Sequence, residues 1–313
     1  MKKIITTVLF LAIIITTNAQ NIEFNSKELY PEGTAYSKKQ NTFFVSSLHY
    51  GKISKVDFKG NVTDFITDEE LISTIGILAD DKRKLLYVCI SDPGVSLKTN
   101  AATQMKLAKL AAYDLETGKR KFIADLGALN KDGGNFANDV TFDDEGNIFV
   151  TNSFSPLIYK ITQTGEASIF ATSDMWKGEG FNLNGIVFHK DGYLIAAQSN
   201  TGILYKINLL NPTIITKIKT TPLLGADGLV LANNNELLVI SNSAQKVVRL
   251  LLDNKCENAT ADGEVNTKFS FPTTGLFLKK KYYVLNAKLN EIFDPKATKT
   301  SNFLLQQIQF VKK

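Results

Sequence analysis

A single pattern recurs along this chain: an apolar strand, a short polar turn and a second apolar strand. Its three clearest copies begin at Asn138, Asn184 and Asp227. In each of these copies the turn comes 8 residues after the first position, at Gly146, Gly192 and Asn235. Weaker copies in the same register begin at Glu32, Ile75 and Thr274, so successive copies start 43, 63, 46, 43 and 47 residues apart. Repeats of about 40–50 residues are typical of β-propeller blades.

Further strand-like runs complete each repeat. Two such runs follow each hairpin, for example 157–161 with 167–170, and 247–252 with 265–269. Four short antiparallel strands make one blade, and closing six blades into a ring removes most exposed sheet edges. We therefore predict an all-β, six-bladed β-propeller over residues 20–313, with 22–24 pairing with the C-terminal run 303–311. A β-sandwich or β-helix is the alternative, but the long regular period argues against both.

Two details of the repeats need an explanation. Five of the six copies have glycine at the second position, which indicates either a backbone crowded by a neighbouring blade or a positive φ. The second repeat is longer than the others, with an insertion at about 92–110. We expect a short helix over 101–110 within it. The insertion is expected to be either a lid over a site or a loop without a function.

The N-terminus has the pattern of a secretory signal peptide. Lys2 and Lys3 precede an apolar run over 4–15, and small residues follow at 17–19. We predict a signal peptide over 1–19 and a secreted or periplasmic mature protein. A membrane anchor is the alternative, but the run is shorter than the roughly 20 residues of a spanning helix.

Charge and cysteine content narrow the choice of partners. The net charge is +5, and removing Lys2 and Lys3 leaves +3, which is too mild to indicate nucleic-acid binding. Cys89 and Cys256 fall in different blades, so we expect two free thiols rather than a disulfide. No later apolar run could span a membrane, and we expect a monomer that acts on a small-molecule substrate.

Polar residues converge where the blades meet. The innermost strand of each blade lines a propeller's channel, so the first position of each copy should lie at one channel mouth. These positions are Glu32, Ile75, Asn138, Asn184, Asp227 and Thr274. Two carboxylates held together repel, so one is protonated or a cation lies between them. Oxygen ligands suit one hard divalent cation, for which Ca²⁺, Mg²⁺, Mn²⁺ and Zn²⁺ are all candidates.

Turn formation is the competing explanation for these residues. Asn-Gly and Asp-Gly pairs favour turns. Each copy, however, already has a hairpin turn 8 residues later, so the polar residues at the strand entrance are additional to it.

The loops after the second strands should lie at the same mouth. They are rich in hydroxyl and amide groups and include His49 and Asn152. Such a ring suits a polyhydroxylated or otherwise polar small ligand, although loops are polar in any protein. A lone histidine such as His49 is more often a surface residue than a ligand-binding one.

The spacing of these positions resembles the regucalcin, gluconolactonase and luciferin-regenerating-enzyme family of six-bladed propellers over nearly all of the mature chain. The family's metal ligands correspond to Glu32, Asn184 and Asp227, and its substrate-side Asn-Asp pair corresponds to Asn138-Asp139. The resemblance implies a divalent-metal-dependent hydrolase of a lactone or related ester. Sugar lactonases of the family have arginine two residues before this asparagine, whereas this chain has Phe136, which argues against a sugar lactone.

The resulting hypothesis is hydrolysis assisted by a Lewis-acid cation. Asp227 would be both a metal ligand and the proton acceptor, and Asn138 and Asn152 would orient the substrate, with His49 as a further contact. One alternative is a non-catalytic propeller, stabilised by metal, that binds a small ligand or a protein partner. Another is a condensing enzyme like the strictosidine-synthase-type propellers, which do without metal.

Overall fold

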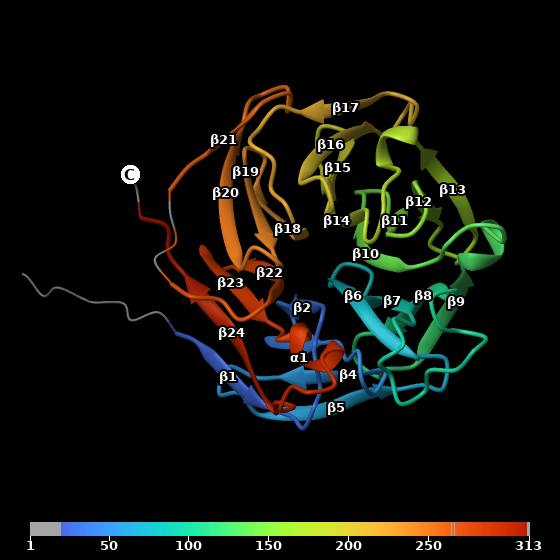
Figure 1. Ribbon diagram of the computed structural model, residues 1–313, viewed down its shortest axis with the longest axis vertical. Coiled ribbons are helices and arrows are strands. Elements are labelled where there is room, and N and C mark those ends of the chain that lie inside the picture. Colours follow the sequence, from blue (N-terminus) through green and yellow to red (C-terminus); the bar gives the residue numbers. More distant parts are fainter. Residues whose placement is uncertain (1–19, 264, 266, 312–313) are drawn as a thin grey trace, which may run out of the picture.

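The computed structural model describes residues 20–263, 265 and 267–311. Within them, six antiparallel sheets of four strands each surround a central axis (Figure 1). The predicted six-bladed β-propeller is therefore confirmed. The predicted signal peptide, 1–19, lies outside the described residues. No helix in the part of the chain that is described has the length and apolar character needed to cross a membrane.

The blades follow one another along the chain, each running from the innermost to the outermost strand. Blades 1 and 2 are β2 (Thr34–Ser37), β3 (Thr42–Val45), β4 (Lys52–Val56) and β5 (Val62–Thr67), then β6 (Ser73–Asp80), β7 (Leu85–Ser91), β8 (Ala108–Asp114) and β9 (Arg120–Asp125). Blades 3 and 4 are β10 (Ala137–Phe142), β11 (Ile148–Asn152), β12 (Leu157–Ile161) and β13 (Ala167–Thr172), then β14 (Leu183–His189), β15 (Tyr193–Gln198), β16 (Ile203–Asn208) and β17 (Ile215–Ile218). Blade 5 is β18 (Ala226–Asn233), β19 (Glu236–Ser241), β20 (Lys246–Leu252) and β21 (Ala259–Ala261). Blade 6 is β22 (Pro272–Leu278), β23 (Lys281–Asn286), β24 (Asn302–Ile308) and β1 (Ile22–Asn25).

Burial follows the position of a strand within its blade. The second strands, such as β11 and β15, are buried along their whole length because neighbouring blades cover both faces, and they are correspondingly apolar. The outermost strands β5 and β13 expose about every other residue. The core therefore lies between adjacent blades, where large side chains such as Tyr87 and Phe149 are fully buried.

The ring closes as the sequence predicts. Strand β1 pairs with β24, with Ile22 opposite Leu305 and Phe24 opposite Phe303. The first described strand thus forms the outer edge of the blade built from the C-terminal segment (Figure 1). This pairing joins the two ends of the propeller, so the ring has no gap at that blade.

Two expected elements differ in the structure. The outermost strand of blade 5 is β21 (Ala259–Ala261), not a strand over 265–269. The helix expected over 101–110 is also wrong, because residues 101–106 form turns and β8 begins at Ala108. Met105 has a φ of +57° and its N–H donates to the carbonyl of Asp92, which ends any helical turn.

Partly buried polar contacts tie the insertion between β7 and β8 to blade 1 and hold it together internally. The ammonium of Lys98 donates to the carbonyls of Gly51, Asp68 and Leu71 at 3.2, 3.0 and 2.9 Å. The carboxylate of Asp92 accepts bonds from the hydroxyls of Thr99 and Thr103, each at 2.7 Å. The insertion is therefore part of the wall of the propeller and not a freely hinged lid.

Both cysteines are buried and free, as the sequence predicts. Cys89 lies in β7 of blade 2, and Cys256 lies in the loop between β20 and β21 of blade 5. Their separation into different blades explains why no disulfide forms.

Candidate functional site at the channel mouth

The six predicted entrance positions converge on the channel, and in five of the six blades a backbone irregularity redirects the side chain at this position. In the innermost strands of blades 2 to 6 the register shifts across the entrance residues, for example between Ala137 and Val140 in β10 and between Ala226 and Leu229 in β18. Such β-bulges re-aim side chains that would otherwise follow the pleat. Asn138 and Asp227 thus leave the sheet ladder and face the axis.

Glycine at the second position lets adjacent blades approach each other. A Cβ on Gly33 would lie 2.3 Å from the carbonyl oxygen of Ile75, and one on Gly185 would lie 2.2 Å from that of Asp227. Neither glycine has a positive φ. Of the two explanations open at the sequence level, crowding by the neighbouring blade is therefore correct here.

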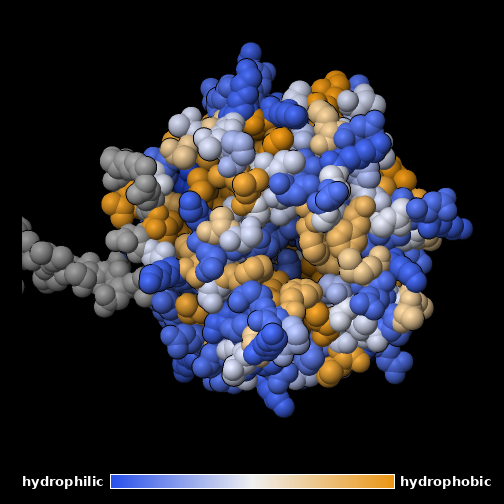
Figure 2. All heavy atoms as spheres, viewed as in Figure 1, coloured by the Kyte–Doolittle hydropathy of each residue, from blue (hydrophilic) through white to orange (hydrophobic). Residues whose placement is uncertain are grey.

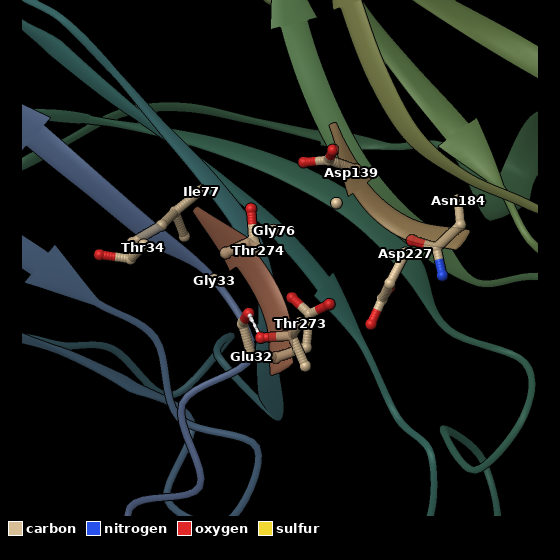
Figure 3. A pocket seen from close by; sticks show the side chains of 11 residues that line it. Glu32, Gly33, Thr34, Gly76, Ile77, Asp139, Asn184, Asp227, Thr273 and Thr274 are labelled. Carbon is tan, nitrogen blue, oxygen red and sulfur yellow. Dashed lines mark hydrogen bonds between the residues drawn. The ribbon is translucent and has the colours of Figure 1, made fainter. Parts of the chain in front are cut away.

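A small cavity lies between the innermost strands. Its free volume is about 10 Å³, and three carboxylates line it: Glu32, Asp139 and Asp227. Asn184 and Thr274 also line it. Figure 3 shows the side chains around one space, with Asp139 on a different side from Glu32 and Asp227. A cavity of this size holds one water molecule or one monatomic ion and no organic group.

Burial and mutual repulsion govern the charges of this cluster. Burial, opposed by hydrogen bonds from Asn242 and Asn184, raises the pKa of Asp227 to about 7. Burial raises the pKa of Asp139 to about 6. Burial, followed by the negative charges of Asp227 and Asp139, raises the pKa of Glu32 well above its ordinary range. No basic side chain of the described residues pairs with these three buried carboxylates, and a cation would stabilise such a cluster.

The donor set fits a hard divalent cation. Two carboxylates and an amide, Glu32, Asp227 and Asn184, offer only oxygen ligands from the side chains, which is the chemistry that Ca²⁺, Mg²⁺ or Mn²⁺ prefers. In the described residues no group of three or more His, Cys, Asp or Glu side chains is arranged to hold a metal. A cation at this cavity therefore depends on the amide as well as on the carboxylates.

Hydroxyl groups hold the entrance residues in place. Ser46 Oγ accepts bonds from the N–H groups of Glu32 and Gly33 at 3.1 and 2.7 Å. Ser153 Oγ accepts a bond of 2.8 Å from Asn138 Nδ2, and Thr151 Oγ1 donates to the carbonyl of Asn184 at 2.7 Å. These hydroxyls of the predicted ring thus support the site, whereas Ser199 and Ser243 line the mouth.

One polar atom at the mouth has no partner. Asn138 Oδ1 is buried and accepts no hydrogen bond within the described residues, although Asn138 lines the cavity at the mouth. Buried acceptors are nearly always paired. This oxygen is therefore available to a bound molecule or water.

Two predicted substrate contacts lie elsewhere. Asn152 Oδ1 accepts bonds from the N–H groups of Phe136, Phe154 and Ser155, and its Nδ2 donates to the hydroxyl of Tyr159. Asn152 is completely buried and is not among the residues that line the mouth. His49 is bonded to the insertion through Val95, with Nδ1 3.0 Å from the carbonyl, and it does not line the mouth either.

Above the small cavity the channel widens into a cavity of about 580 Å³, which is in the size range of small-molecule sites. Its floor carries Glu32, Asn138, Asn184 and Asp227. Its wall is mainly apolar, and six of its apolar side chains come from segments that connect strands around the ring: Leu48, Pro93, Phe136, Phe181, Leu224 and Phe293. We call these six residues the apolar collar. Figure 2 shows this face hollowed near its centre, with hydrophobic and hydrophilic side chains side by side around the hollow.

The chain shares its fold with several solved structures. The major allergen Mala s 1 of Malassezia sympodialis matches with a TM-score of 0.74 and 18% identity over 93% of this chain and 96% of the allergen. A gluconolactonase from Xanthomonas campestris matches with a TM-score of 0.62 and 14% identity over 94% and 90%. A luciferin-regenerating enzyme matches with a TM-score of 0.62 and 12% identity over 93% and 98%.

These matches confirm the predicted resemblance at the level of the fold. No known family profile matches the sequence, and no curated protein matches it. The functional argument therefore depends on the geometry of the site.

Sequence reasoning does not anticipate three features of the site. Asp139 is expected only as part of a substrate-side pair, whereas its carboxylate lines the small cavity; its place where other copies have glycine is a signal for that role. The polar loop of Asn242 is expected at the mouth, but not the bond of 2.7 Å that Asn242 donates to Asp227 Oδ2. The apolar collar comes from segments far apart in the chain and has no local sequence pattern.

Proposed function

We propose that this protein is a divalent-cation-dependent hydrolase of a lactone or related ester. The observation that supports it best is the position of an ion-sized cavity lined by Glu32, Asn184 and Asp227 directly at the floor of a ligand-sized cavity. A cation on these oxygens would polarise the acyl carbonyl and make bound water more acidic.

Asp227 is the proposed proton acceptor. Water oxygen attacks the acyl carbon, its proton passes to the Asp227 carboxylate, and the acyl C–O bond breaks. The proton then returns to the departing alkoxide oxygen, giving a hydroxy acid from a lactone, or an acid and an alcohol from an ester. A general base typically contributes about 10²–10⁴-fold, and a cation bound beside Asp227 would favour its ionised form, which is the form that accepts the proton. Asn242 holds one oxygen of this carboxylate.

Asn138 is the proposed positioning residue for water or substrate. Its Nδ2 is bound to Ser153, so the amide plane is held while Oδ1 has no partner within the described residues. This oxygen can only accept a hydrogen bond. It therefore suits the attacking water or a hydroxyl of the substrate, and not the acyl oxygen itself.

The test is hydrolysis of a panel of lactones and esters with Ca²⁺, Mg²⁺, Mn²⁺ or Zn²⁺ and after chelation. Activity should need a cation and should fall by about 10²-fold or more in Asp227→Ala, because both a ligand and the base are lost. Asp144→Asn is the matched control, since Asp144 is an exposed carboxylate in a hairpin turn.

Tight cation binding without turnover of any panel member would refute the hydrolase. That result would instead support the alternative of a non-catalytic, metal-stabilised propeller that binds a ligand or protein partner.

We also propose that the protein is exported after removal of residues 1–19, because of the basic, apolar and small-residue segments described above. N-terminal sequencing of the protein from its native cells should find the first residue close to Gln20. A mature protein that begins at Met1 would refute the proposal.

A further inference from the structure

Exposure of the apolar collar to water is energetically unfavourable unless a bound molecule covers it. Leu224, Phe293 and Phe181 are 59%, 50% and 42% exposed, although each is a large apolar side chain. All three lie around one cavity. Large apolar side chains gathered at one concave place mark a binding site more often than chance exposure does.

Two aromatic rings, those of Phe136 and Phe181, form part of the wall of this cavity. Phe154 packs against both, and the three ring centroids lie 5.0 to 5.2 Å apart. The rings of Phe136 and Phe181 are nearly perpendicular, at 88°. Mutual packing fixes these rings, so they offer a firm apolar surface to a flat or extended group.

Polar groups in the same cavity are restricted to two places. One is the floor, with Asn138 and the carboxylates, and the other is the side formed by blades 4 and 5, where Ser199, Asn200, Asn242 and Ser243 lie. A ligand with hydroxyls on every side would place several of them against the collar. Each hydroxyl that loses water there without a new partner would weaken binding by about tenfold.

We propose that the substrate is a lactone or ester with an apolar alkyl or aryl group, which binds in the apolar collar while the carbonyl meets the floor. This inference rests on the proposed hydrolase function for the carbonyl, and on the collar alone for the apolar group. It gives Phe181 and Phe293 the role of specificity-determining residues. It also gives a physical reason for Phe136, which lies in the aromatic wall.

The test uses γ-lactones with alkyl tails of one to seven carbons, compared with glucono-δ-lactone. Their kcat/KM should rise about fourfold for each methylene that enters the collar and should be lowest for the sugar lactone. Phe181→Ala combined with Phe293→Ala should lower kcat/KM for the longest tail at least tenfold and leave the shortest tail within about twofold. Phe277→Ala is the matched control, because Phe277 is 37% exposed and lies on β22, outside the cavity wall.

Calorimetric binding of the corresponding γ-alkyl lactams, which resist hydrolysis, separates the two proposals. Affinity that rises with tail length and falls in the double variant, without turnover of any lactone, supports the apolar ligand and refutes the hydrolase. Efficient turnover of glucono-δ-lactone, with no effect of tail length or of the double variant, refutes the apolar ligand and leaves the hydrolase standing.

Discussion

Asp227→Asn is expected to stabilise the cation-free protein at pH 8 while it removes function. Burial raises the pKa of Asp227 from 3.8 to about 7. A shift of one unit corresponds to about 1.4 kcal/mol, so ionising this buried group at pH 8 costs the folded state up to about 4 kcal/mol.

The sign follows from proton binding. Between pH 4 and pH 7 the folded protein holds a proton on Asp227 that the unfolded chain has already lost. The free energy of unfolding therefore falls as pH rises through this range. Glu32 and Asp139, whose pKa values burial also raises, add to the same slope.

An asparagine at this position cannot ionise but still accepts a hydrogen bond, so the bond that Asn242 donates to Asp227 at 2.7 Å has a partner in the variant. The net gain at pH 8 should be about 2–4 kcal/mol; it should shrink toward pH 4 and vanish below about pH 3, where Asp227 is protonated in both states.

The assay is urea unfolding from pH 4 to pH 8 in the presence of a chelator, for the wild type, Asp227→Asn and Asp144→Asn. Only Asp227→Asn should flatten the pH dependence. Addition of the cation at 100 times its Kd should then stabilise the wild type by about 2.7 kcal/mol and Asp227→Asn much less. A wild type that is equally stable at pH 5 and pH 8 without cation, or an Asp227→Asn protein destabilised at pH 8, would refute the reasoning on buried carboxylates.

Three further predictions concern how the blades and loops hold the site. Gly185→Ala should destabilise the protein by about 3 kcal/mol or more in the same urea titration and weaken cation binding, because the new Cβ would lie 2.2 Å from the carbonyl oxygen of Asp227. Gly192→Ala is the control: no atom lies within 4 Å of the new Cβ, but φ is +84°, so the cost should be only about 1 kcal/mol. Asn152→Ala should lower the free energy of unfolding by about 2–4 kcal/mol, because it leaves buried N–H groups unpaired. KM for any substrate should stay within about twofold; a large change in KM without a loss of stability would mean that Asn152 contacts the substrate after all. Lys98→Met should make limited proteolysis within 93–106 about tenfold faster, because three carbonyls lose their donor; an unchanged cleavage rate would mean that the insertion is held by other contacts.

Local patterns in the sequence determined the propeller and most of its entrance residues. The pattern of an apolar strand, a turn and a second apolar strand can be recognised within about 13 residues of sequence. Its recurrence every 43 to 47 residues for most copies is compatible with few folds other than blades around an axis. Once the fold is a ring, equivalent positions must meet near the axis, which is why Glu32, Asn184 and Asp227 could be placed together before any coordinates. The pairing of β1 with β24 followed from the same need to close the ring.

The tertiary structure alone decided which polar groups remain free and what the mouth can bind. From the sequence, Asn138 and Asn152 are equally good candidates for a substrate contact. In the structure, however, Asn152 Oδ1 accepts hydrogen bonds from three backbone N–H groups, whereas Asn138 Oδ1 has no partner within the described residues. Similarly, the alanines and lysines of 101–110 favour a helix locally, but the bonds of Asp92 to Thr99 and Thr103 and of Lys98 to Leu71 accompany turns there. The apolar collar takes its residues from six separate segments between Leu48 and Phe293. Residues this far apart in sequence meet only because the blades pack around one axis. Hydrogen bonds and apolar contacts depend on distances of a few ångströms in space, which a local sequence pattern does not contain.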